Sequence, residues 1–221
     1  MKFIVFDTGS IISLAMNELL WTLPLLKKRF KGEFYIPHSV KLELVDKPME
    51  IKRFKFEAIN ILKLIQEGVL KVHEKINIEE EFNLVNSIFF IKGNPLKLIQ
   101  MGEMEALVLA KRLNASLYFV DERTMRLFVE DSNSLRRLLE RKFHDRVSVN
   151  RSKLDIFKKK FSSLSVARST ELMSVDYEMD IFKDYTVVSK NDFLDGILWG
   201  LKLRGVSISS EEINEMISLI K

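Results

Sequence analysis

Continuous hydrophobic runs alternate with helical patterns along the N-terminal half of the chain. The segments FIVF at 3–6 and LYFV at 117–120 contain only apolar residues, which is typical of strands buried on both faces of a sheet. Shorter apolar runs at 34–36 and 69–72 predict two further strands. Because strands alternate with helices, we expect an α/β domain with three layers, in which helices cover both faces of a central parallel sheet.

Helices are predicted between these strands, because apolar residues recur at helical spacing in four segments. In the second of them charged residues lie between the apolar ones, which indicates an amphipathic helix that packs one face on a core. Gly68 is expected to end the second of these helices, and the sequence Gly93-Asn94-Pro95 is expected to end the third. The four segments are 11–19, 51–65, 82–89 and 106–113.

The pattern changes after residue 130. Helical spacing and basic residues dominate from there to about residue 183, and Tyr185–Val188 is predicted to return to the sheet as a fifth strand. A helix follows at 194–201, and the last helix opens with Ser209-x-x-Glu212, the pattern of a capping box. We therefore predict three parts: a core at 1–130, a basic helical insertion at 131–183, and a last strand with C-terminal helices at 184–221.

Composition excludes several kinds of chemistry. The 221 residues include no cysteine, which excludes a disulfide framework, thiol catalysis and a cysteine-based zinc site. The three histidines are far apart in sequence. No apolar stretch reaches the roughly 20 residues that a membrane span requires, and the apolar run at the N-terminus is too short for a signal peptide. We therefore expect a cytoplasmic protein with no membrane partner.

Four acidic residues occupy the positions where α/β sheets place their chemistry, at or after the carboxyl ends of strands. Asp7 and Asp121 each end a buried strand, Glu43 follows the strand at 34–36, and Glu103 opens a helix. Each alone is explained as a helix cap, a first-turn acid or a solvated helix residue. Together they can converge in one crevice, where a divalent cation relieves the repulsion among them. Carboxylate oxygens favour Mg²⁺ or Mn²⁺.

Glu105 is the alternative to Glu103 for the third position. The two residues are two positions apart, about 200° round a helix, so both cannot face the same pocket. The sequence leaves this choice open.

These residues resemble the PIN domains, a family of small α/β nucleases with a central parallel sheet. The resemblance is carried by three segments, IVFDTGSIISLA, YIPHSVKLELV and GEMEALVLAKRLNASLYFVDERTMR, and it covers roughly residues 1–130 and, more loosely, 184–221. One departure is that about 50 mostly helical, basic residues separate the fourth acid from the predicted fifth strand. By this resemblance the catalytic residues and metal ligands are Asp7, Glu43, Glu103 and Asp121, with Thr8, Ser10, Glu105 and Glu122 as candidate auxiliary residues.

The resemblance implies an endoribonuclease that uses Mg²⁺ or Mn²⁺ to hydrolyse single-stranded RNA. Such an enzyme is either a toxin with an antitoxin partner or an RNA-processing nuclease, and a homodimer is a further candidate assembly. The alternative function is an inactive or weakly active RNA-binding scaffold. Residues 136–160 hold ten basic and three acidic residues, which suits either an RNA backbone or a solvated helix face. The candidate RNA contacts there are Arg136, Arg137, Arg141, Lys158, Lys159 and Lys160.

Overall fold

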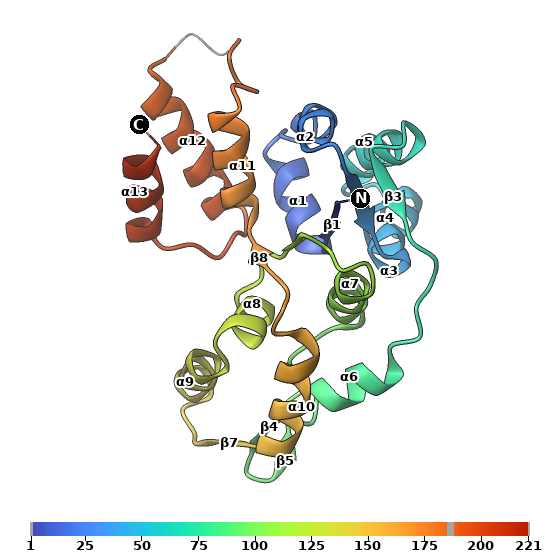
Figure 1. The fold of residues 1–221 in the computed structure, drawn as a ribbon, viewed down its shortest axis with the longest axis vertical. Coiled ribbons are helices and arrows are strands. Elements are labelled where there is room, and N and C mark those ends of the chain that lie inside the picture. Colours follow the sequence, from blue (N-terminus) through green and yellow to red (C-terminus); the bar gives the residue numbers. More distant parts are fainter. Residues whose placement is uncertain (1, 185–187, 221) are drawn as a thin grey trace.

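A parallel sheet forms the centre of the molecule. The computed structural model describes residues 2–184 and 188–220, and within them five strands pair in the order β3-β2-β1-β6-β8 (Figure 1). All neighbouring strands run parallel. The α/β class and the parallel sheet predicted from the sequence are confirmed. The strands are β1 (Phe3–Phe6), β2 (Glu33–Ile36), β3 (Leu70–Val72), β6 (Leu117–Phe119) and β8 (Val166–Ala167).

The central strand β1 explains the three-layer architecture. Alternate side chains of a strand point to opposite faces, and Ile4 and Phe6 enter one hydrophobic core whereas Val5 enters a second. The Phe6 ring stacks on Phe119 of β6 with a centroid separation of 5.0 Å. A strand between two cores needs apolar residues on both faces, which is why β1 is a continuous apolar run.

Each core has its own set of helices. The first contains buried residues of α1 (Thr8–Met16), α2 (Thr22–Phe30), α5 (Lys55–Gln66) and the C-terminal helices α11 (Ser169–Glu178), α12 (Lys190–Leu203) and α13 (Ser210–Leu219). The second contains those of α6 (Glu79–Val85), α7 (Met101–Arg112), α8 (Arg123–Glu130), α9 (Ser132–Phe143) and α10 (Arg151–Phe161). Short helical turns follow β2, namely α3 (His38–Lys41), the π-helix η1 (Leu42–Asp46) and α4 (Lys47–Glu50).

A small antiparallel sheet replaces part of one predicted helix. The pattern at 82–89 predicts a single helix, but α6 ends at Val85 and Phe89 begins strand β4 (Phe89–Ile91), which pairs with β5 (Asn94–Pro95) and β7 (Val147–Val149). The Asn86 side chain explains the break, because its Oδ1 accepts hydrogen bonds from the backbone N–H groups of Leu98 and Ile99. The predicted helix is therefore wrong at its C-terminal end.

The fifth strand of the sheet lies earlier than predicted. It is Val166–Ala167, which falls inside the range 131–183 predicted as a helical insertion and pairs with β6. Of the predicted strand Tyr185–Val188, residues 185–187 lie outside the described residues and Val188 lies in a bend. In Figure 1 β8 leads directly from α10 into α11, so the chain returns to the sheet before the C-terminal helices begin.

The remaining C-terminal prediction holds in detail. Helix α13 begins with the predicted capping box, in which Ser209 and Glu212 bond reciprocally to each other's backbone N–H groups. None of the helices within residues 2–184 and 188–220 is long and apolar enough to cross a membrane.

Candidate acidic site

Asp7 lies at the carboxyl end of the central strand. Its backbone N–H donates to the Phe119 carbonyl at 3.1 Å, which fixes it beside β6, and its Oδ1 accepts from the Ser10 backbone N–H at 2.7 Å as the N-cap of α1. The side chain is buried, with 1% of its surface exposed. Burial, together with the negative charges of Asp121 and Glu103, raises the pKa of Asp7 from 3.8 to about 8. Asp7 is therefore a buried acid with acidic neighbours.

Asp121 follows β6 at the same edge of the sheet and is also buried. Both of its carboxylate oxygens accept hydrogen bonds from Ser169, from the backbone N–H and from the hydroxyl, each at 2.7 Å. Burial raises the pKa of Asp121, while hydrogen bonds from Ser13 and Ser169 lower it. A Cβ atom on Gly9 would lie 3.5 Å from Asp7 Oδ2 and 3.9 Å from Asp121 Cβ, so this glycine borders both acids.

Glu43 reaches the site from the π-helix η1. The Thr8 hydroxyl donates to Glu43 Oε2 at 2.7 Å, which joins it to the residue that follows Asp7. A Cβ atom on Gly102 would lie 3.4 Å from Glu43 Oε1, so the glycine lets the first turn of α7 approach this carboxylate closely. π-Helical turns frequently occur at functional sites, where the extra residue redirects a side chain.

Glu103 extends the acidic group from the first turn of α7. Its Oε2 accepts from the Gln100 backbone N–H at 2.8 Å. Burial raises the pKa of Glu103 from 4.5 to about 7, and the charges of Glu122 and Glu43 add to this effect. Glu122 itself is exposed and caps α8 by accepting from the Met125 backbone N–H at 2.8 Å.

The structure distinguishes Glu103 from Glu105. Glu105 points elsewhere, with Oε1 accepting from the Ile76 backbone N–H and Oε2 from that of Ser39, each at 3.0 Å. It is 4% exposed and ties α7 to the start of α3 and to the segment after β3. Glu103 is the acid of this pair whose charge acts on Asp7.

The chemistry of this donor set fits a hard divalent cation. The candidate ligands are carboxylate oxygens with a neighbouring hydroxyl, and their mutual repulsion is what a cation would neutralise. Across residues 2–184 and 188–220, no group of three or more acidic or histidine side chains is arranged to hold one ion. Each of the four carboxylates instead accepts an internal hydrogen bond. Sharing one cation therefore requires at least some of these side chains to turn toward the others.

The candidate RNA contacts lie on α9 and α10, and some of them have intramolecular partners. Arg136 pairs with Glu140 at 3.1 Å, and Lys160 with Glu81 at 2.6 Å. Arg137 donates to the Ser134 hydroxyl at 2.9 Å. The side chains of Arg141, Lys158 and Lys159 are exposed.

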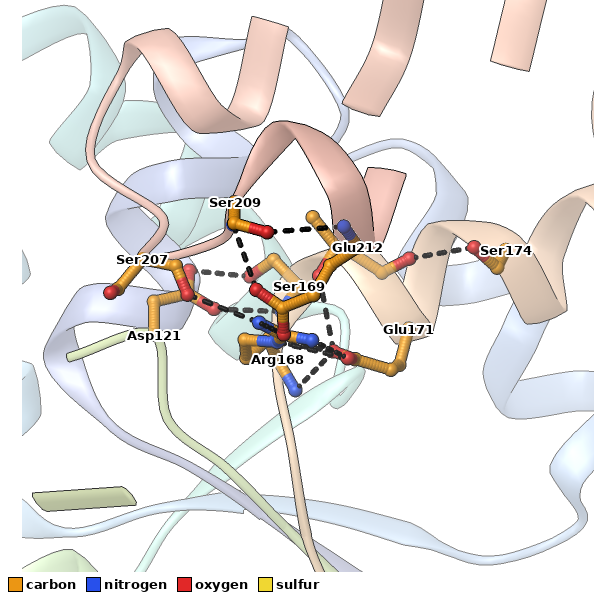
Figure 2. A network of polar contacts seen from close by, with 9 residues as sticks. Asp121, Arg168, Ser169, Glu171, Ser174, Ser207, Ser209 and Glu212 are labelled. Carbon is orange, nitrogen blue, oxygen red and sulfur yellow. Dashed lines mark hydrogen bonds and ion pairs between the residues drawn. The ribbon is translucent and has the colours of Figure 1, made fainter. Parts of the chain in front are cut away.

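Sequence reasoning missed the partners that hold Asp121. Ser169 opens α11, and the preceding Arg168 joins an ion-pair network with Glu171 and Glu212 (Figure 2). The local sequence offers one signal, an acid three residues after Arg168 that suits the start of a helix. Nothing in the sequence links this helix start to an aspartate 48 positions earlier.

A parallel sheet with acidic residues at the carboxyl ends of its central strands defines an α/β domain of nuclease type. A family model described as a PIN domain matches residues 3–133, and the chain belongs to this family. Members of the family are generally nucleases that use divalent metals. No curated protein and no solved structure matches the chain. The resemblance seen in the sequence is confirmed, and residues 168–212 of the network around Asp121 lie beyond the matched region.

Proposed function

We propose that the protein is an endoribonuclease that hydrolyses phosphodiester bonds of single-stranded RNA with Mg²⁺ or Mn²⁺. The observation that carries this proposal is the burial of Asp7 and Asp121 at the carboxyl ends of adjacent strands, where the charges of Asp121 and Glu103 raise the pKa of Asp7. A bound divalent ion would supply an activated water and stabilise the charge that develops on the phosphate.

Different parts of the fold hold the four acids proposed to bind the cation. Asp7 and Asp121 are buried at the ends of adjacent strands, so their backbone positions are fixed by the sheet. Glu43 comes from the π-helix η1 and Glu103 from the first turn of α7, and they add two further carboxylates to the donor set. Thr8, already bonded to Glu43, is placed to orient that carboxylate or a water next to it.

Exposed basic residues on α9 and α10 are proposed to contact the RNA backbone. Arg141, Lys158 and Lys159 present positive charge to solvent, and such contacts weaken as salt concentration rises. Cleavage by in-line attack of water leaves a 5′-phosphate and a 3′-hydroxyl. A toxin role with an antitoxin, and a homodimer, stay predictions.

One observation favours a second function, an RNA-binding scaffold without catalysis. In the part of the chain that the structure describes, no three acids are arranged to hold one ion. A scaffold would bind RNA in a salt-dependent manner and leave it intact.

A cleavage assay separates the two functions. Labelled single-stranded RNA is incubated with the full chain and Mn²⁺, with chelator, and with the variants Asp7→Asn and Asp195→Asn. Asp195 lies on α12, a helix that contributes none of the candidate ligands, and serves as the matched control. We expect Mn²⁺-dependent cleavage by the wild type and the control and its loss in Asp7→Asn. Equal cleavage by Asp7→Asn, or none by the wild type, would contradict the proposal.

A further inference from the structure

We propose that Ser169 is a positioning residue for Asp121, and that Arg168 holds Ser169 in place. The inference rests on the proposed function, because it concerns the orientation of one of the proposed metal ligands. It assigns a role to residues outside the matched range 3–133.

Ser169 holds the Asp121 carboxylate at two points. The backbone N–H binds Oδ1 and the hydroxyl binds Oδ2, each at 2.7 Å. A carboxylate held through one oxygen can still rotate about its Cβ–Cγ bond, whereas two simultaneous bonds fix its plane. The Ser13 side chain also hydrogen-bonds to this carboxylate, and three bonds leave part of its capacity of about four lone pairs for another ligand. The two hydrogen bonds from Ser169 therefore orient the Asp121 carboxylate and still leave it able to coordinate a metal ion.

The surroundings of this contact are dry. Ser169 has no exposed surface and Asp121 is 2% exposed. The N–H groups in the first turn of a helix lack partners within the helix, and α11 directs one of them at the carboxylate. Water does not compete for these bonds, so the geometry is set by the start of α11.

Arg168 fixes the start of α11 to the C-terminal helix. Its Nη1 donates to Glu212 Oε1 at 2.9 Å and to the Ser207 carbonyl at 3.1 Å, and its guanidinium also pairs with Glu171. The Arg168 backbone N–H donates to Glu171 Oε2 at 2.8 Å, which completes the capping of α11. Only 6% of the Arg168 surface is exposed, and a buried arginine with several charged hydrogen bonds is costly to disturb.

These contacts close a ring around Asp121. The Ser207 backbone N–H donates to the Asp121 carbonyl at 3.2 Å, the Ser207 carbonyl accepts from Arg168, and Ser169 follows Arg168 in the chain. Figure 2 shows the contacts of Asp121 with Ser169 and those of Arg168 with Glu171 and Glu212 next to one another. A shift of α13 or of the loop before it is thus transmitted to the Asp121 carboxylate.

The test measures Mn²⁺ binding to the full chain by calorimetry, with Mn²⁺ alone as the probe. Loss of a hydrogen bond that orients a ligand typically lowers metal affinity by about 10–100-fold, and we expect Ser169→Ala to raise the Kd by that factor. The control is Ser174→Ala, on the same helix, whose hydroxyl donates to the Thr170 carbonyl. This variant is expected to bind Mn²⁺ as the wild type does.

A double variant tests the role of Arg168. Arg168→Lys keeps the positive charge but loses the planar fork, and it is expected to weaken Mn²⁺ binding as well. If Arg168 acts through Ser169, the variant with both changes loses no more affinity than the weaker-binding single variant. Additive losses would overturn the role of Arg168.

The outcomes also separate this inference from the proposed function. Wild-type binding and RNA cleavage, combined with unchanged Mn²⁺ affinity in Ser169→Ala, would overturn the positioning role and leave the nuclease intact. A wild type that neither binds Mn²⁺ nor cleaves RNA would remove the proposed function, and the positioning role with it. An affinity loss in Ser174→Ala equal to that in Ser169→Ala would show a general effect of α11 and also overturn the inference.

Discussion

Carboxylates are buried both at the carboxyl edge of the sheet and on α11, and the two places differ in their neighbours. At the carboxyl edge of the sheet, Asp7 lies within the influence of Asp121 and Glu103, and each of the three accepts a hydrogen bond. On α11, Asp176 is fully buried, and within the described residues neither of its oxygens accepts a hydrogen bond. Its neighbour Thr22 donates to the Leu19 carbonyl instead.

Burial raises the pKa of both Asp7 and Asp176, so burial alone does not mark a functional site. The sheet edge differs because several acidic side chains lie there together and hydrogen-bond donors fix their orientation. The Thr22 side chain and the charge of Arg29 lower the pKa of Asp176, and no acidic neighbour is among the causes that raise it. We therefore assign cation chemistry to the sheet edge and a structural role to Asp176.

The largest effect is expected from replacing Asp7, with the same replacement at Asp176 as the comparison. Asp7→Asn should lower kcat/KM for cleavage of single-stranded RNA by about 10²–10³, the range for loss of a preorganised electrostatic group. Asp176→Asn, measured in the same assay at pH 7, should change kcat/KM by less than about threefold. A comparable loss of activity in both variants would remove the distinction between the two places.

The second prediction concerns pH and stability. The folded-state pKa of Asp176 is raised from 3.8 to about 7, so the folded protein holds a proton that the unfolded chain releases. The contribution of this proton to the free energy of unfolding is fully present below pH 3.8 and is lost as the pH rises toward 7. At about 1.36 kcal/mol for each pKa unit, the loss is roughly 4 kcal/mol at most.

Asp176→Asn lacks this titration. Its free energy of unfolding relative to the wild type should therefore increase by a few kcal/mol between pH 4.5 and pH 8. Urea denaturation of both proteins across this range measures the difference. A difference that stays constant with pH would mean that Asp176 titrates normally.

The third prediction separates Glu105 from Glu103. Glu105→Ala leaves the buried backbone N–H of Ile76 and the N–H of Ser39 without their acceptor, and each such loss costs about 1–3 kcal/mol. Glu103→Gln should reduce cleavage and keep most of the stability. Chemical denaturation and the RNA assay of both variants give the result, and the reverse pattern would exchange their roles.

The smallest effect is expected on α10. Lys158 and Lys159 are exposed. Lys158→Ala should weaken RNA binding a few-fold and reduce the slope of log affinity against log salt concentration by about one. The acidic site should be untouched, so cleavage at saturating RNA stays near the wild-type rate. Filter binding at several salt concentrations measures the slope, and an unchanged slope would place the RNA elsewhere.

The same contrast explains how much the sequence could predict. Asp7 and Asp121 end apolar runs long enough to identify as buried strands, so their place at one sheet edge follows from the parallel direction of those strands. Strand β8 consists of two residues, Val166 and Ala167, too few to stand out as an apolar run. Ser169 therefore went unrecognised, because its link to Asp121 exists only once β8 has joined the sheet.

Tertiary contacts also decided the region after α6. The apolar residues Phe82, Val85 and Phe89 follow helical spacing, and that pattern alone favours one continuous helix. The Asn86 side chain captures backbone N–H groups 12 and 13 positions later and ends the helix. Such a long-range bond leaves no local trace, which is why the small antiparallel sheet was not predicted.

The central claim, that the acids at the sheet edge act together on a divalent cation, is tested most directly by titrating the full chain with Mn²⁺ in calorimetry. At pH 7, in two buffers of different ionisation enthalpy, the account predicts binding with net proton release. Asp7 and Glu103 have raised pKa values of about 8 and about 7 and must ionise to coordinate. Asp7→Asn should abolish or greatly weaken this binding. Absence of binding by the wild type, or equal binding by Asp7→Asn, would contradict the account.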